Sequence, residues 1–265
     1  MSVKLHDSVL GDGPDVVLLH GLFGMGSNLG SLARALQDNY RVHSVDLPNH
    51  GHSEWLEEAD IGALASALAD WMDDRNLSQA AFVGHSLGGK VAMQLALSEP
   101  TRVESLVVAD IAPVAYQPRH DAVFAGLDAV AAAMCRSRSE AAELMAAHIR
   151  EEQVIQFLLL SLQRSEEGTY NWRFNLDGLR RNYAAIQQAP VPEIVYPGRV
   201  LFIKGADSDY ILPEHQDIIL GLFPQAEVKI MADCCLLYTS PSPRDRHLDR
   251  VCRLLREKGG GGGGG

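Results

Sequence analysis

Short apolar runs alternate along the chain with apolar residues at helical spacing. The runs have the length of buried strands and cover residues 15–20, 40–46, 80–83, 103–109, 199–203 and 226–231. Between them, apolar residues recur every three or four positions, within 29–36, 61–72, 89–97 and 213–223. This alternation predicts an α/β fold in which helices flank a mostly parallel central sheet.

The pattern changes between residues 112 and 189, where helical spacing continues without β-branched runs. We interpret this stretch as a helical cap inserted into a core that is formed by residues 1–111 and 190–234. Apolar residues make up 46% of the 265 positions, which is enough for one large core with such an insertion.

Residues 235–265 do not continue this pattern. The segment 235–245 reads C-L-L-Y-T-S-P-S-P-R-D, which is the peptide encoded by a transposon-library sequencing adapter, and residues 249–258 resemble a translated flow-cell sequence. Glycine then fills positions 259–265. We interpret 235–265 as a non-native tail, and a native basic helix with a flexible glycine end is the alternative.

Charge and cysteine usage narrow the class of protein. A net charge of −11 and an isoelectric point of about 5.3 argue against nucleic acid or an anionic membrane as a partner. No apolar run approaches the length of a membrane span, and the N-terminus lacks the apolar segment of a signal peptide. The cysteines suggest no disulfide framework, which favours the cytoplasm: Cys135, Cys234, Cys235 and Cys252.

The most informative motif is G-x-S-x-G at residues 84–88, between a predicted strand and a predicted helix. A serine at such a sharp turn has an exposed hydroxyl and sits at a helix N-terminus, where negative charge is favoured. We therefore predict Ser86 as a nucleophile. His85 is its neighbour in the chain, and we expect its side chain to point away from the serine.

A second motif, H-G-x-x-G at residues 20–24, follows the first buried strand. A loop at this place can aim a backbone N–H at a developing oxyanion, with the N–H after the nucleophile as the second donor. We expect the backbone amides of Leu22 and Leu87 to form this oxyanion hole.

Three places hold an acid able to orient a histidine. Asp110 ends the strand at 103–109 and is our first choice, although it could also cap a helix of the insertion. Asp207 and Asp209 follow the strand at 199–203, but Ser208 occupies the usual position of the acid there. Asp177, inside the predicted cap, is a weaker candidate.

Two other groups carry less chemistry. His50 and His52 have the spacing of a metal pair, but without a carboxylate or cysteine cluster we favour a hydrogen-bonded structural loop. Trp172 is expected to pack the cap, and a role in lining an acyl pocket is secondary. No metal or organic cofactor is predicted.

Taken together, these residues resemble the α/β-hydrolase superfamily, and within it the bacterial esterase group related to YbfF-type and ABHD11-type hydrolases. The likeness runs over roughly residues 2–234 and includes the cap, with its motifs at residues 20–24, 49–51, 84–90, 110–113, 154–159 and 172–176. It implies hydrolysis of esters or thioesters of small to medium acyl chains, without a cofactor, and it supports Asp110 as the acid.

The same resemblance points to a missing group. The family shows a Gly-His-Trp run after the last strand, and its histidine is the general base. Here Cys235, Leu236 and Leu237 stand in that place, so the chain as written is expected to lack the base and to be inactive. The alternatives are a non-catalytic ligand-binding homologue, or a C–C hydrolase or perhydrolase on the same fold.

Overall fold

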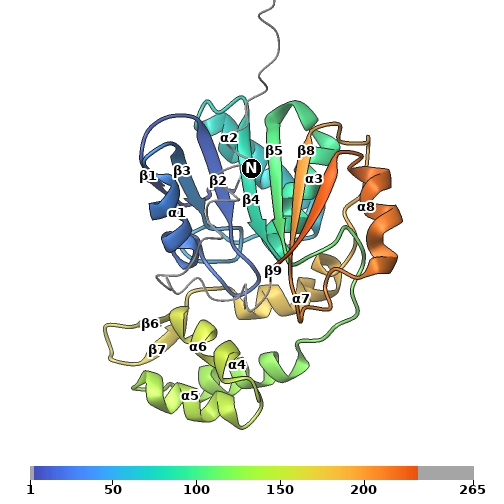
Figure 1. Ribbon diagram of the computed structural model, residues 1–265. Helices are drawn as coiled ribbons and strands as arrows, with labels where there is room; N and C mark the ends of the chain where they lie inside the picture. The colour runs from blue at the N-terminus through green and yellow to red at the C-terminus, as the bar shows by residue number, and fades with distance from the viewer. Residues whose placement is uncertain (1–2, 232–265) are drawn as a thin grey trace, which may run out of the picture.

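The computed structural model describes residues 3–231 of the chain. Seven strands form one sheet in the order β1-β3-β2-β4-β5-β8-β9 (Figure 1). Only β1 is antiparallel to its neighbour, and the other adjacent pairs are parallel. The strands are β1 (Asp7–Leu10), β2 (Asp15–Leu19), β3 (Arg41–Val45), β4 (Ala80–His85), β5 (Val103–Ala109), β8 (Arg199–Gly205) and β9 (Ala226–Met231).

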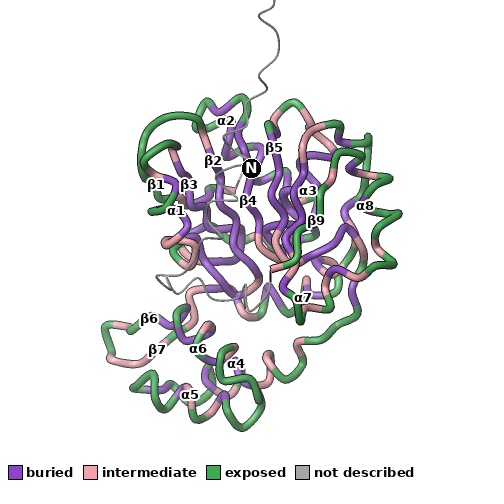
Figure 2. The backbone as a smooth tube through the Cα atoms, viewed as in Figure 1, coloured by how far each residue is buried: buried purple, intermediate pink, exposed green. Residues whose placement is uncertain are grey.

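Helices cover both faces of this sheet. They are α1 (Gly30–Leu36), α2 (Ile61–Asp74), α3 (Leu87–Ser98) and α8 (Gln216–Leu222). Alternate residues of β2 enter different cores: Val17 and Leu19 belong to the cluster that contains α2, α3 and α8, and Val16 and Leu18 to the cluster with α1. Burial of β2, β4 and β5 on both faces explains their continuous apolar runs, and Figure 2 shows these central strands buried. The predicted α/β class is confirmed.

The sequence pattern missed β1. This strand begins with Asp7 and Ser8, and none of its residues is fully buried. It lies at the edge of the sheet against β3, where no alternation of apolar and polar residues is required to fill a core. A short half-polar edge strand therefore leaves little signal in the sequence.

Between β5 and β8 the chain forms a separate group of elements, which we call the insertion (residues 112–198). It contains α4 (Asp121–Ala133), α5 (Arg138–Ala146), α6 (Glu152–Leu160) and α7 (Leu176–Ile186). Figure 1 shows α4, α5 and α6 gathered at one end of the sheet. Whether these residues act as a cap over the site stays a prediction at this point.

The expectation of helices alone in this stretch is wrong in one place. β6 (Leu162–Arg164) and β7 (Tyr170–Trp172) form an antiparallel hairpin after α6. Its turn has Gly168 at φ +85°, a conformation that favours glycine, and the Ser165 and Thr169 hydroxyls are hydrogen-bonded across it. The strands are only three residues long, too short for a period-2 pattern to be visible.

The interpretation of residues 235–265 as a non-native tail lies outside the described residues, as does the end of the predicted core at 234. Within residues 3–231, no helix is long and apolar enough to cross a membrane. Cys135 is buried and free of any disulfide.

Candidate active site

Ser86 lies at the turn between β4 and α3, with a backbone φ of +49°. This left-handed conformation is rare for a residue with a side chain, and it is found mostly at sites where the surroundings enforce it. Its N–H donates to the Ala109 carbonyl at 2.9 Å, and the Gly88 N–H donates to the His20 carbonyl at 3.0 Å. The turn is thus fastened to the ends of both neighbouring strands.

The glycines of the motif are required by backbone contacts. A Cβ at Gly84 would lie 2.4 Å from the Gly88 carbonyl oxygen, and one at Gly88 would lie 2.4 Å from the Leu19 carbonyl oxygen. Both distances are far below van der Waals contact. The helix can approach β2 and β4 this closely, and hold Ser86 in its strained turn, only if these two positions carry no side chain.

Ser86 faces a cavity of about 220 Å³. From the core, Leu22, Leu87 and Asp110 line it together with the serine. The insertion supplies an apolar wall, formed by Val123, Val154, Phe157, Leu158 and Ile186. Trp172 is not among the lining residues: it stacks on Phe174 and its indole N–H donates to the Leu127 carbonyl, so it packs inside the insertion.

Asp110 follows β5 directly, beside the serine turn, and has a φ of +58°. Its N–H donates to the Ile203 carbonyl at 2.8 Å, which fixes the backbone between β5 and β8. Its carboxylate oxygen Oδ1 is buried, and it has no hydrogen-bond partner within the described part of the chain. A buried acceptor of this kind normally has a partner, and residues 3–231 supply none for this oxygen.

The other candidate acids lie elsewhere. Asp207 is exposed on the loop after β8, and Asp209 pairs with Arg119 at 2.7 Å on the surface. Asp177 is exposed in the first turn of α7. None of the three lines the cavity that contains Ser86.

The loop after β2 approaches the serine through a turn closed by the Gly24 N–H and the Gly21 carbonyl. Leu22 lies inside this turn and Leu87 begins α3, and both line the cavity. Neither backbone amide donates a hydrogen bond to another residue in the described range. Two N–H groups without an acceptor among residues 3–231 therefore lie on the cavity of Ser86, one in the loop after β2 and one at the N-terminus of α3.

Two buried histidines hold this loop, a role that the sequence analysis did not identify for His20. The His20 ring bonds the Gly21 carbonyl with Nδ1 and accepts from the Leu47 N–H with Nε2 at 2.9 Å. The His50 ring bonds the Pro48 carbonyl with Nδ1 and accepts from the Phe23 N–H with Nε2 at 3.2 Å. An Nε2 that accepts cannot carry a proton, so both rings are neutral.

The pKa values agree with this arrangement. Burial lowers the pKa of His20 to about 4. Burial, with a smaller effect from His20, lowers the pKa of His50 to about 3. The contacts of His50 are thus those of a hydrogen-bonded structural loop. Among residues 3–231, no group of three or more potential metal ligands occurs.

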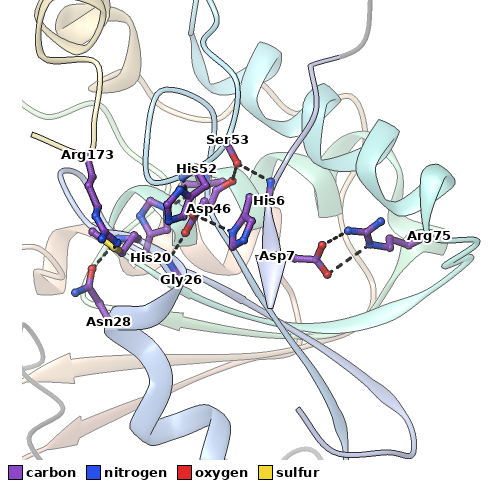
Figure 3. Close-up of polar contacts among 12 residues, drawn as sticks. His6, Asp7, His20, Gly26, Asn28, Asp46, His52, Ser53, Arg75 and Arg173 are labelled. Carbon is purple, nitrogen blue, oxygen red and sulfur yellow. Dashed lines mark hydrogen bonds and ion pairs between the residues drawn. The ribbon is translucent and has the colours of Figure 1, made fainter. Parts of the chain in front are cut away.

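Asp46 organises the rest of this region (Figure 3). Its carboxylate accepts from the Gly26 and His52 backbone amides, at 2.6 and 2.9 Å, and lies 3.2 Å from His6 Nδ1. Gly51 has a φ of +57°, and a Cβ there would overlap the Asp46 carboxylate. The Asn49-His50-Gly51 motif is therefore a loop built around a buried carboxylate.

The insertion contacts the same loop through residues far away in sequence. The Ser161 hydroxyl donates to the Phe23 carbonyl at 2.7 Å. The Asn175 side-chain amide donates to Asn49 Oδ1 at 3.1 Å, and the Asn175 N–H donates to the Asn49 carbonyl at 2.9 Å. The motif at residues 172–176 in the insertion is therefore in direct contact with the motif at residues 49–51 in the core. Local sequence patterns do not indicate this contact.

Two further histidines line the cavity, His85 and His120. The His85 ring lies close to Gly21, where a Cβ would be 2.8 Å from Nδ1, and the expectation that it points away from Ser86 stays a prediction. Burial lowers the pKa of His85, and the Asp110 carboxylate opposes this shift. His120 bonds the Tyr183 hydroxyl. Among the described residues, no histidine hydrogen-bonds Ser86 or Asp110.

Comparison with known proteins agrees with this geometry. Residues 16–235 match the family model described as the alpha/beta hydrolase family. The chain is 40% identical over 219 residues to esterase YbfF of Escherichia coli (strain K12), covering 82% of this chain and 84% of that protein. It is 37% identical over 250 residues to the sn-1-specific diacylglycerol lipase ABHD11 of Mus musculus, covering 91% of this chain and 81% of that protein.

A solved structure described as a marine microorganism esterase superposes with a TM-score of 0.90 at 30% identity, covering 96% of this chain and all of that one. The chain therefore belongs to the α/β-hydrolase family. Within that family it is of the YbfF/ABHD11 type, as its motifs suggested.

Proposed function

We propose that this chain carries the site of a serine hydrolase that acts on carboxylic esters or thioesters of small to medium acyl chains. The observation that carries the proposal is the position of Ser86. It sits in a strained turn at the start of α3 and shares one cavity with two unpaired amides and with Asp110. The esterase and lipase names of the relatives support an ester as substrate.

In the proposed reaction the Ser86 hydroxyl attacks the acyl carbon while a histidine removes its proton. The Leu22 and Leu87 amides stabilise the oxyanion of the tetrahedral intermediate. The histidine then returns the proton to the leaving alcohol or thiol, and an acyl group remains on Ser86. Water, activated by the same histidine, releases the acid and restores the serine.

Asp110 would orient this histidine and stabilise its charged form. The base itself is expected in the segment after β9, where the family has Gly-His-Trp and this chain has Cys-Leu-Leu at positions 235–237. The unpaired Oδ1 of Asp110 supports this assignment. Without the histidine, Ser86 stays a neutral alcohol, and we expect the chain as written to be inactive.

Residues 112–189 of the insertion would act as the cap of this site. Five apolar side chains of the insertion face Ser86 across the cavity, which suits an acyl chain. The proposal requires no metal, organic cofactor or nucleic acid, and it keeps the cytoplasm as the predicted compartment.

The test uses a restored chain, in which the residues after Cys234 are replaced with Gly-His-Trp and a helix of the family type. A fluorophosphonate probe should label this protein at Ser86, and Ser86→Ala should abolish labelling. Ser27→Ala, at an exposed serine near the same loop, serves as the matched control and should still be labelled.

Persistent labelling of the Ser86→Ala protein would show that another residue is the nucleophile. A restored chain that binds acyl ligands but takes no label would instead be a non-catalytic binding protein. Labelling without turnover of esters or thioesters would favour a C–C hydrolase or perhydrolase on the same fold.

A further inference from the structure

Two buried polar side chains of α3 face the end of the insertion. Lys90 and Gln94 are one helical turn apart on α3 and therefore lie on one side of it. They are only 2% and 7% exposed. Polar side chains this deeply buried require partners, and both find them in the backbone that connects α7 to β8.

Lys90 binds the end of α7. Its Nζ donates to the carbonyls of Gln187 and Gln188, both at 2.7 Å. Carbonyls at a helix C-terminus lack partners within the helix and carry partial negative charge, so an ammonium group is stabilised there. Burial nevertheless lowers the pKa of Lys90 to about 7, which shows how far the group is removed from water.

Gln94 binds the next stretch of the same connection. Its amide nitrogen donates to the Val191 carbonyl at 2.9 Å, and its amide oxygen accepts from the Val191 N–H at 2.7 Å. The beginning of the insertion joins at this point too, because the Tyr116 N–H donates to the Gln187 carbonyl at 3.0 Å. The connection from α7 to β8 is thus tied directly to one side of α3, and the beginning of the insertion is tied to the same place through Gln187.

We propose that Lys90 and Gln94 are positioning residues, which hold the end of α7 so that the insertion's wall of the cavity keeps a fixed place opposite Ser86. Ile186 and Gln187, at the fastened end of α7, themselves line the cavity. Ser86 directly precedes α3, and the anchors of the opposite wall, Lys90 and Gln94, lie within the helix. This inference rests on the proposed function only in taking the cavity as the acyl site.

The first test measures backbone hydrogen exchange in the chain as it stands. Gln94→Leu removes the two bonds to Val191, and the Val191 amide should exchange about tenfold faster. Gln225→Leu is the matched control, because exposed Gln225 also donates to a carbonyl of this connection, that of Pro197, but from outside α3. It should leave exchange at Val191 and Tyr116 unchanged. Unchanged exchange in Gln94→Leu would overturn the proposal.

The second test distinguishes positioning from a general structural role. Two neutral ketones, 2-pentanone and 2-octanone, are titrated by NMR against each protein. Gln94 does not line the cavity, so Gln94→Leu can change ligand binding only through the position of the wall. We expect the Kd of 2-octanone to rise about fivefold more than that of 2-pentanone, since the longer chain has more apolar surface to place against the insertion's wall.

An equal change for both ketones would mean that the two residues merely stabilise the fold, and would contradict positioning. Lys90 itself lines the cavity, so Lys90→Met would change the lining directly. Gln94→Leu therefore decides, and it leaves both hydrogen bonds of Lys90 in place. Failure of the proposed function would be seen in a different experiment, in which fluorophosphonate does not label the restored chain. That result does not depend on the rate of hydrogen exchange at Val191.

Discussion

At the scale of single residues, the site depends on backbone positions that tolerate no side chain. The G-x-S-x-G spacing was enough to predict Ser86 and its turn, because close backbone contacts at the two glycines leave no room for side chains. The contacts at Gly88 show this: a Cβ there would meet the carbonyl oxygens of Leu19 and His20 at 2.4 and 2.7 Å. Neither atom can move without displacing β2 or the loop that carries Leu22.

We predict that Gly88→Ala lowers the free energy of unfolding by about 3 kcal/mol, the upper end of the range for overpacking. Gly221→Ala is the control, because Gly221 lies in α8 and a Cβ there would meet nothing within 4 Å. That variant should be more stable by roughly 0.5–1 kcal/mol, from helix propensity alone. Urea unfolding of both variants checks the difference. Similar values for the two would show that the close approach at Gly88 is not required.

In the sequence, two observations favoured Asp110 over the other candidate acids. Ser208 occupies the usual position of the acid after β8, and the family likeness supports Asp110. The unpaired Oδ1 and the shared cavity add physical grounds that sequence does not contain. The pairing of Asp209 with Arg119 gives that acid a different role, in joining the insertion to the loop after β8.

In the restored chain, Asp110→Asn should lower kcat for a short ester by about 10⁴-fold, the loss seen when a reference triad aspartate is replaced by asparagine. The mutation keeps the side-chain shape but removes the negative charge that holds the histidine tautomer. Asp209→Asn, an isosteric change at an exposed acid, should leave kcat within a few-fold of the parent. A larger loss from Asp209→Asn or Asp207→Asn would assign the acid to the loop after β8.

At the scale of elements, the loop after β2 is held from several directions. His20 and His50 attach it to the 46–53 loop, and Ser161 attaches it to the insertion. The H-G-x-x-G motif predicts the loop and its Leu22 amide but not these attachments. They join residues 27 and 138 positions apart, and no local period of apolar residues reports contacts of that range.

The neutral histidines make stability depend on pH. Their pKa values are about 4 and 3 in the fold, against 6.5 for an ordinary histidine. Between pH 6.5 and about 4 the unfolded chain therefore binds protons that the folded chain does not, and acid favours unfolding. Each histidine adds a slope of up to about 1.4 kcal/mol per pH unit in this window.

We predict that the urea-derived free energy of unfolding falls from pH 7 to pH 5, and that His50→Leu makes this fall smaller while lowering stability at pH 7. His52→Gln, at the exposed histidine of the same loop, should retain the full fall because His20 and His50 remain. An equal fall in all three proteins would show that the two rings are not the source of the acid sensitivity.

At the scale of the whole molecule, alternation of apolar runs with helical spacing predicted the parallel sheet. It succeeded because β2, β4 and β5 are buried on both faces. It failed for β1 and for the β6–β7 hairpin, which are short and half polar. The hydrogen bond from Lys90 to the Gln187 carbonyl, 97 positions away, also left no signal in the sequence. A lysine in a helix is usually exposed, so the sequence alone does not show that this one is buried.

Residues 3–231 therefore place Ser86, Asp110, Leu22 and Leu87, to which we assign the roles of nucleophile, acid and oxyanion donors, around one cavity. No histidine among these described residues is hydrogen-bonded to Ser86 or Asp110. β9 ends at Met231, and the proposed base is expected in the sequence that follows it. At the sheet edge formed by β9, Val228 and Ile230 are 50% and 64% exposed. We therefore expect the base in this following segment.

The most direct measurement compares hydrolysis of 4-nitrophenyl butyrate by the chain as written and by the restored chain, each with and without Ser86→Ala. The account predicts a kcat higher on the order of 10⁶-fold in the restored chain, the cost of losing the base histidine in a comparable serine hydrolase. That gain should disappear with Ser86→Ala. Equal rates for the two chains, both dependent on Ser86, would contradict the account, because they would mean that residues 1–265 already supply the base.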